Sequence, residues 1–315
     1  MSSIVKSFSF PKGETRGDTF YIKHGVDSFT VIDCFLLSES DHFENNRQEE
    51  IIDEIVNQSK GRIRRFISTH PDHDHIAGIE ELFRRWPTDN FYAVDNDVPS
   101  DESDPSLSMY LELKKNKNYA IKQGIKRCWL NDDNGAEDPH QASGIHFLWP
   151  DLNNEEFKTA LKVVAEGGNK NNICPIITYT LKGGAKYMWM GDLETDLQTA
   201  YYEMYKSSIP HVNILFQPHH GRKSGAVPDN LLEQLQPQLI IIGNAPSEHI
   251  DYGDSQKTIT QNASGDLLFE NDGEYVHIYS QKSVDNLPDC LENDPLRAYA
   301  SYAGTPCYCG SLKVK

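Results

Sequence analysis

The 315-residue sequence has no apolar run long enough to cross a bilayer, and no apolar segment near its start that resembles a secretory signal. We therefore expect a cytoplasmic protein that does not insert into a membrane. Basic residues are also scarce, since 30 Lys and Arg side chains stand against 47 Asp and Glu side chains, for a net charge of −17. This charge excludes a broad basic surface for nucleic acid, but it leaves anionic substrates open at a site that holds metal ions.

Cysteines are few and scattered along the chain. Six are present, and the close pair Cys307 and Cys309 lacks the C-x₂-C spacing of structural zinc sites. In a reducing compartment such cysteines remain free thiols. A small metal clip that also includes Cys290 is the alternative.

Strand and helix patterns alternate through most of the chain. Residues 49–58 place Ile51, Ile52, Ile55 and Val56 on one face of an expected helix. Strands are expected where β-branched and aromatic residues cluster, at residues 20–23, 29–35, 63–68, 176–190 (a hairpin), 212–216 and 239–243. This alternation predicts an α/β protein built from layers of sheets and helices.

The expected main domain spans residues 7–280. Within it, residues 95–168 form a more acidic insertion, which is either a wall or lid over the functional site or a surface insertion without a functional part. Residues 281–315 lack a clear periodicity and are expected to form a short C-terminal extension.

The densest polar cluster is the segment 69–78, Thr-His-Pro-Asp-His-Asp-His-Ile-Ala-Gly, which follows an expected strand and precedes an expected helix. Packing alone does not justify so many polar groups, because buried charges require partners or a metal. Imidazole nitrogens and carboxylate oxygens are ligands that zinc, manganese and iron accept. The segment therefore predicts a divalent metal site, and a solvated acidic loop is the alternative.

Two further polar positions also follow apolar strands: Asp192 comes after 186–190, and His219–His220 comes after 212–216. In layered α/β folds, loops at one edge of a sheet meet and form the active site. Together the clusters offer enough ligands for two metal ions that share the Asp192 carboxylate, namely His70, Asp72, Asp74, His75, Asp192 and one of His219 and His220.

These motifs resemble those of the metallo-β-lactamase superfamily, whose first motif is H-x-H-x-D-H followed by glycine. Here Asp72 stands in place of the second histidine, which gives H-x-D-x-D-H. This variant, with Gly191-Asp192 and Pro218-His219-His220-Gly221, is similar to the hydrolase domain of DNA-uptake (competence) channel proteins and to teichoic-acid phosphorylcholine esterases. Asp33 matches the aspartate that follows an early strand in the superfamily. The resemblance covers residues 7–280 and implies a four-layer αββα sandwich.

The resemblance implies that one ion is held by His70, Asp72 and Asp192, and a second by Asp74, His75, Asp192 and a histidine of the 219–220 pair. The histidine that the superfamily supplies between the first motif and the aspartate is missing, and its place falls at residues 171–174. Zinc is the expected ion. Manganese is the alternative, because oxygen-rich ligation favours harder ions.

The expected activity is hydrolysis of phosphoester bonds by metal-activated hydroxide, of the phosphodiesterase or nuclease type, because paired metals suit an in-line displacement. Asp74 and His219 are the expected catalytic residues, with His219 meeting the substrate and His220 binding metal. Asn172, Arg222 and His249 are expected to line the substrate site.

The expected substrate is a small phosphoester or single-stranded nucleic acid. One alternative is a lactone or thioester hydrolase of the same fold. Another is a non-catalytic subunit that retains the fold and binds a protein partner through its acidic surface or C-terminal extension.

Overall fold

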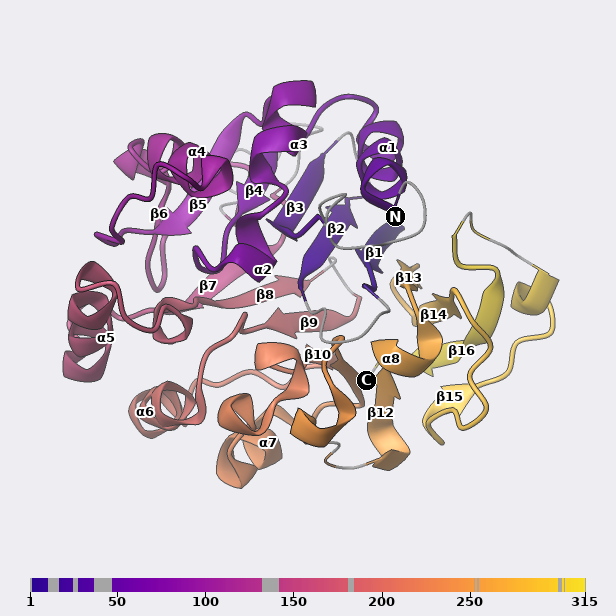
Figure 1. Cartoon of the computed structure of the whole chain (residues 1–315). Coiled ribbons are helices and arrows are strands. Elements are labelled where there is room, and N and C mark those ends of the chain that lie inside the picture. Colours follow the sequence, from indigo (N-terminus) through magenta and orange to yellow (C-terminus); the bar gives the residue numbers. More distant parts are fainter. Residues whose placement is uncertain are drawn as a thin grey trace.

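The computed structural model describes residues 2–10, 17–24, 28–36, 47–131, 142–180, 184–251, 253, 255–299, 302 and 304–314. Two mixed β-sheets lie against each other, and helices cover their outer faces (Figure 1). This arrangement confirms the predicted α/β architecture with its αββα layers. None of the helices in these ranges combines the length and apolar character needed to span a membrane.

The first sheet has ten strands within the described ranges, in the order β15-β16-β14-β13-β1-β2-β3-β4-β5-β6. Strands β3, β4 and β5 run parallel, whereas the strands from β14 through β13, β1 and β2 to β3 pair antiparallel. The strand bounds are β1 Ser3–Ser7, β2 Thr19–Lys23, β3 Phe29–Cys34, β4 Arg65–Ile67, β5 Asn90–Val94, β6 Ala120–Ile121, β13 Leu267–Asn271, β14 Tyr275–Ser280, β15 Leu291–Glu292 and β16 Cys307–Lys313.

The second sheet has the order β12-β11-β10-β9-β8-β7. Strands β9 to β12 run parallel, and β7, β8 and β9 pair antiparallel. The bounds are β7 Ile145–Trp149, β8 Ile176–Thr180, β9 Lys186–Trp189, β10 Ile214–Phe216, β11 Leu239–Ile242 and β12 Thr258–Thr260.

Helices α1, α3 and α4 lie over the first sheet, and α5, α6 and α7 lie beside the second (Figure 1). The predicted isoleucine face of α1 turns inward, since Ile51, Ile52 and Ile55 are fully buried. The helix bounds are α1 Arg47–Ser59, α2 His73–Ile76, α3 Ile79–Arg85, α4 Pro105–Leu113, α5 Glu155–Ala165, α6 Thr195–Tyr205, α7 Asp229–Leu235 and α8 Gln261–Ser264.

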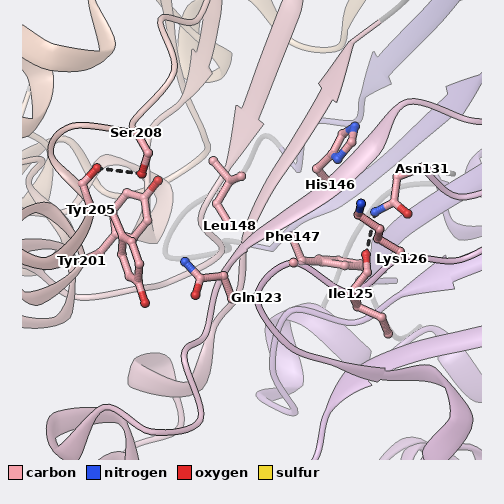
Figure 2. Close-up of a pocket in the computed structure, with 11 residues that line it drawn as sticks. Gln123, Ile125, Lys126, Asn131, His146, Phe147, Leu148, Tyr201, Tyr205 and Ser208 are labelled. Carbon is pink, nitrogen blue, oxygen red and sulfur yellow. Dashed lines mark hydrogen bonds between the residues drawn. The ribbon is translucent and has the colours of Figure 1, made fainter.

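The acidic insertion predicted over 95–168 contributes to both sheets, because β6 pairs with β5 and β7 pairs with β8. Its residues Gln123, Phe147 and Leu148 line a cavity of about 200 Å³ together with Tyr201 and Tyr205 of α6 (Figure 2). The candidate metal ligands do not line this cavity. Residues 132–141 of the insertion lie outside the described ranges. Its role as a lid stays a prediction.

The C-terminal extension adds β15 and β16 to the first sheet, where β16 pairs antiparallel with β14. Cys290 and Cys309 engage different partners: the Cys290 thiol donates to the Gln238 carbonyl, and the Cys309 thiol donates to the Ser280 hydroxyl. Residues 281–315 therefore extend the sheet. The domain boundary at residue 280 stays a prediction.

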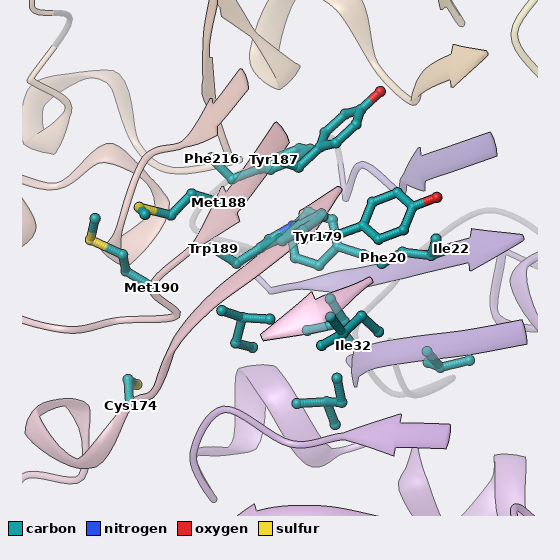
Figure 3. Packing of buried hydrophobic residues seen from close by; sticks show 14 of the residues in the cluster. Phe20, Ile22, Ile32, Cys174, Tyr179, Tyr187, Met188, Trp189, Met190 and Phe216 are labelled. Atoms are coloured by element: carbon teal, nitrogen blue, oxygen red, sulfur yellow. The ribbon is translucent and has the colours of Figure 1, made fainter. Parts of the chain in front are cut away.

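Aromatic side chains fill the space between the two sheets (Figure 3). Trp189 and Phe216 of the second sheet stack with ring centroids 4.8 Å apart, and Phe20 of β2 packs edge-on against both. Phe269 of β13 meets Phe216 and Tyr187 in the same way. Asp192 and His219–His220 lie just beyond the ends of β9 and β10. The aromatic packing therefore fixes the position of these polar residues relative to the first sheet.

Candidate metal centre

Asp192 lies at the centre of the polar cluster, directly after β9. Gly191 before it has φ +52°, and a Cβ at that position would stand 2.8 Å from Thr69 Cβ and 2.9 Å from Cys174 Sγ. Only glycine tolerates both the left-handed backbone and this close approach. The Asp192 N–H donates to Cys174 Sγ at 3.2 Å. The turn thus carries a buried carboxylate against the histidine segment.

One oxygen of Asp192 faces His75 and His220. The distances from Asp192 Oδ1 are 3.2 Å to His75 Nε2 and 3.5 Å to His220 Nε2. Asp74 joins this group, since its Oδ2 lies 3.6 Å from His220 Nε2. We call Asp74, His75 and His220 the Oδ1 group.

The other oxygen of Asp192 faces His70 and His219. The distances from Asp192 Oδ2 are 4.0 Å to His70 Nε2 and 3.6 Å to His219 Nε2. Asp72 joins this group through its Oδ2, which lies 3.4 Å from His70 Nε2. We call His70, Asp72 and His219 the Oδ2 group. The Asp192 carboxylate therefore separates the polar side chains into two sets, one at each oxygen.

Asp33, at the end of β3, holds the ring of His75. His75 Nδ1 lies 2.8 Å from Asp33 Oδ2, and the same carboxylate accepts hydrogen bonds from the Thr69 N–H at 2.8 Å and the Thr69 hydroxyl at 2.6 Å. A carboxylate on Nδ1 leaves Nε2 as the donor atom for a metal, an arrangement common around metal-binding histidines. The predicted early aspartate therefore orients a candidate ligand.

Asp18 makes a similar approach to His220, and the sequence patterns did not indicate it. Asp18 Oδ1 lies 3.3 Å from His220 Nδ1, and the Asp18 N–H donates to the Asp74 carbonyl at 3.0 Å. One ligand atom from each of Asp18, His75, Asp192 and His220 lies within 4.8 Å of the others. Asp18 is a single carboxylate just before β2 and belongs to no sequence motif. Its place in the site becomes evident only when β2 packs near the end of β10.

Three of the six non-glycine residues with positive φ in the described part of the chain lie at this site. Asp33, His219 and His220 each have φ +53°, in the left-handed region that non-glycine residues rarely occupy. Such residues cost roughly 1–3 kcal/mol each and cluster at functional sites. The turn after β10 therefore holds both histidines in conformations that the surrounding fold must stabilise.

In the Oδ1 group, the carboxylates and the histidines shift one another's pKa in opposite directions. Burial opposes ionisation of Asp192, but His220 and His75 outweigh it and hold the pKa of this carboxyl well below its ordinary value. Burial also opposes a charge on His220, yet Asp192 and Asp18 raise its pKa to about 10. In the same way Asp192 and Asp33 outweigh burial and raise the pKa of His75 well above its ordinary value. The negative charge of these carboxylates therefore favours a positive charge at this position.

In the Oδ2 group, a lysine takes part in setting the pKa of Asp72, and one of the two histidines has a lowered pKa. Burial opposes ionisation of Asp72, but His70 and Lys170 together lower its pKa to about 2. Lys170 Nζ lies 2.6 Å from Asp72 Oδ1, the oxygen that does not face His70. Burial lowers the pKa of His219, so its ring is neutral at pH 7, the state that can bind a metal.

The donor set fits divalent metal ions. Three buried ring nitrogens, the Nε2 atoms of His70, His75 and His220, have no hydrogen-bond partner among the described residues, and neither has Asp192 Oδ1. Ligand atoms about 2.0–2.2 Å from one tetrahedral ion lie roughly 3–4 Å apart. The separations of 3.2–4.0 Å around Asp192 agree with this spacing.

The predicted substrate-contacting residues occupy varied positions. The Asn172 amide donates to Glu194 Oε2 at 3.0 Å and accepts from the Glu194 N–H at 3.2 Å, so it contacts a neighbouring loop. Arg222 follows the histidine turn, where its N–H donates to the His219 carbonyl, and its charge helps to lower the pKa of His219. His249 is exposed on a 3₁₀ helix. A bridge between Arg222 and Ile250 brings its loop beside the histidine turn.

Comparisons with known proteins return solved structures of the metallo-β-lactamase fold. The fold protein YhfI from Bacillus subtilis is 13% identical with a TM-score of 0.41, and the match covers 77% of this chain and 86% of that one. The metallo hydrolase Igni18 from Ignicoccus hospitalis is 14% identical with a TM-score of 0.45, over 84% and 98% of the two chains. A diphosphatase of the PhnP family is 13% identical with a TM-score of 0.43, over 86% and 98%.

No family model matches the sequence, and no curated protein matches it significantly. At these similarities the fold assignment rests on the order and packing of the two sheets described above.

Proposed function

We propose that this protein is a metal-dependent hydrolase whose site holds two divalent ions on either side of Asp192. The observation that carries the proposal is the division of the histidines between the two Asp192 oxygens. Histidines that point their Nε2 atoms at opposite oxygens of one carboxylate suit a bridging ligand shared by two ions. The Nε2 atoms of His70, His75 and His220 have no hydrogen-bond partner among the described residues, which a bound cation would explain better than a purely structural ion pair.

The residues of this chain have separate tasks in the proposed site. Asp33 and Thr69 fix the ring of His75, and Asp18 faces the distal nitrogen of His220. Asp74 lies close to His220 and remains ionised, because His220 and His75 outweigh its burial and lower its pKa. Divalent ions, when bound, lower the pKa of a bound water to about 7 and so supply hydroxide at neutral pH.

Phosphoester hydrolysis is the reaction we favour among those open to such a site. Two ions held by these residues would stabilise both the attacking and the leaving oxygen of an in-line displacement. The side chains of Lys170 and Arg222 add positive charge near the Oδ2 group, where an anionic substrate would approach. A small phosphoester suits the chain better than a long nucleic acid, because the net charge of −17 repels polyanions.

Metal analysis combined with a substrate panel tests the proposal. The metal-free protein is reloaded with zinc or manganese and assayed with chromogenic phosphodiester, phosphomonoester, lactone and thioester substrates. We expect turnover of a phosphoester that depends on the added ion and disappears in Asp192→Asn. Faster turnover of the lactone or thioester would favour the alternative chemistry. Binding of two ions without turnover of any substrate would favour a non-catalytic subunit.

A further inference from the structure

We infer that His219 is a ligand of the ion on the Oδ2 side of Asp192, where it replaces the histidine missing from residues 171–174. This inference rests on the proposed two-ion site and gives His219 a role different from the substrate-facing one expected from sequence. It assigns adjacent histidines of one turn to two different ions.

The position of His219 supports a ligand role. Its Nε2 lies 3.6 Å from Asp192 Oδ2, closer than His70 Nε2 at 4.0 Å from the same oxygen. Both distances agree with the roughly 3–4 Å that separates two ligands of one tetrahedral ion. The Ser224 hydroxyl lies 2.9 Å from His219 Nδ1, so it engages the distal nitrogen and leaves Nε2 directed at the carboxylate.

The backbone around His219 fixes this position. The His219 N–H donates to the Gly191 carbonyl at 2.9 Å, which ties the histidine turn to the residue before Asp192. Gly225 lies against the other side, since a Cβ there would stand 2.6 Å from His219 Cβ. The ring is therefore held by contacts on the Asp192 turn and on the following loop.

The two adjacent histidines diverge enough to serve different ions. Both have φ +53°, and their ring centroids lie 6.3 Å apart with planes inclined by 62°. Because each residue is in the left-handed region, the turn sends one ring to Asp192 Oδ1 and the other to Oδ2. A regular strand or helix would not place two successive side chains on neighbouring atoms of one carboxylate.

Residues 170–174, where the missing histidine would fall, contact other parts of the site. The amides of Asn171 and Asn172 both donate to the Glu194 carboxylate, at 3.3 and 3.0 Å. Cys174 Sγ accepts the Asp192 N–H, and Lys170 holds Asp72 Oδ1. This segment therefore supports Asp192 and Asp72 from outside and leaves the Oδ2 side open to His219.

Metal titration of variants tests the inference without reference to activity. Zinc or manganese is titrated calorimetrically into metal-free protein, and the bound ions are counted by elemental analysis. We expect two ions in the unaltered protein and in the control His211→Ala, whose exposed histidine lies outside the cluster. His219→Ala should bind one ion with unchanged affinity and the second at least about 100-fold more weakly, beyond the 10–100-fold cost of losing an outer partner.

A second variant guards against a folding defect in the first. His219→Asp supplies a carboxylate ligand and tolerates the left-handed backbone, so it should regain the second ion, with a shift in preference toward manganese. If His219→Ala binds two ions with unaltered affinity, the ligand role is refuted and the substrate-facing role is favoured. If the unaltered protein binds fewer than two ions, the proposed two-ion function itself fails and this inference fails with it.

Discussion

Replacing Asp18 with Asn would remove a negative charge beside His220 while keeping the size of the side chain. The main-chain hydrogen bonds of Asp18, from its N–H to the Asp74 carbonyl and from the Phe35 N–H to its own carbonyl, do not involve the carboxylate and should persist. The substitution therefore acts on the 3.3 Å approach of Asp18 Oδ1 to His220 Nδ1. Its effect should appear in metal binding rather than in folding.

The magnitude follows from a comparison with Asp33. Removing an outer-sphere partner of a metal-binding histidine costs about 10–100-fold in metal affinity, or about 1.4–2.7 kcal/mol. Asp33 lies 2.8 Å from its histidine and its side chain is only 1% exposed, so we expect Asp33→Asn to weaken metal binding by an amount near the upper end of this range. Asp18 is more distant and 15% exposed, and we expect Asp18→Asn to weaken binding about tenfold.

The assay is a competition titration of zinc against a chelator of known affinity, with the unfolding temperature measured in parallel. Asp272→Asn is the matched control, because Asp272 Oδ2 lies 3.2 Å from His277 Nε2 in a histidine–carboxylate pair outside the cluster. We expect the control to bind zinc like the unaltered protein. If Asp18→Asn and Asp272→Asn have the same zinc affinity, the positioning role of Asp18 is wrong.

Three further changes test the site, the electrostatics and the core. Asp192→Ala should lose most of both ions in elemental analysis, because one carboxylate serves both groups; full metal content would show that it does not bridge. Burial, aided by Arg65, holds the pKa of His24 well below its ordinary value, so as the pH falls below about 6.5 the unfolded chain takes up a proton that the folded protein binds only at lower pH. As the pH is lowered, the free energy of unfolding then falls by up to about 1.4 kcal/mol per pH unit, and His24→Gln should remove this contribution from denaturation profiles between pH 6 and 5; an unchanged slope would contradict this. Phe269→Ala should lower the free energy of unfolding by about 3–5 kcal/mol, because Phe269 is fully buried between the sheets; a loss below about 1 kcal/mol in chemical denaturation would contradict that packing.

The local patterns of the sequence predicted alternating strands and helices in an α/β protein, whereas the four-layer αββα order followed from the resemblance of its motifs to a known superfamily. The isoleucine spacing in 49–58 predicted the buried face of α1, and the apolar runs 176–190 and 212–216 predicted β8, β9 and β10. Such patterns are informative because burial repeats with the period of each element, so neighbours in sequence report it. The polar clusters at the strand ends were visible for the same reason, since they interrupt apolar runs.

Only the tertiary structure decided how these clusters meet. Which Asp192 oxygen faces His219 and which faces His220 depends on the left-handed turn after β10 and on the packing of β10 beside β9. Asp18 reaches His220 from a position about two hundred residues earlier in the chain, with no motif around it. Periodicity records which face of an element is buried, but contacts between distant segments depend on how the two sheets pack, which no local pattern encodes.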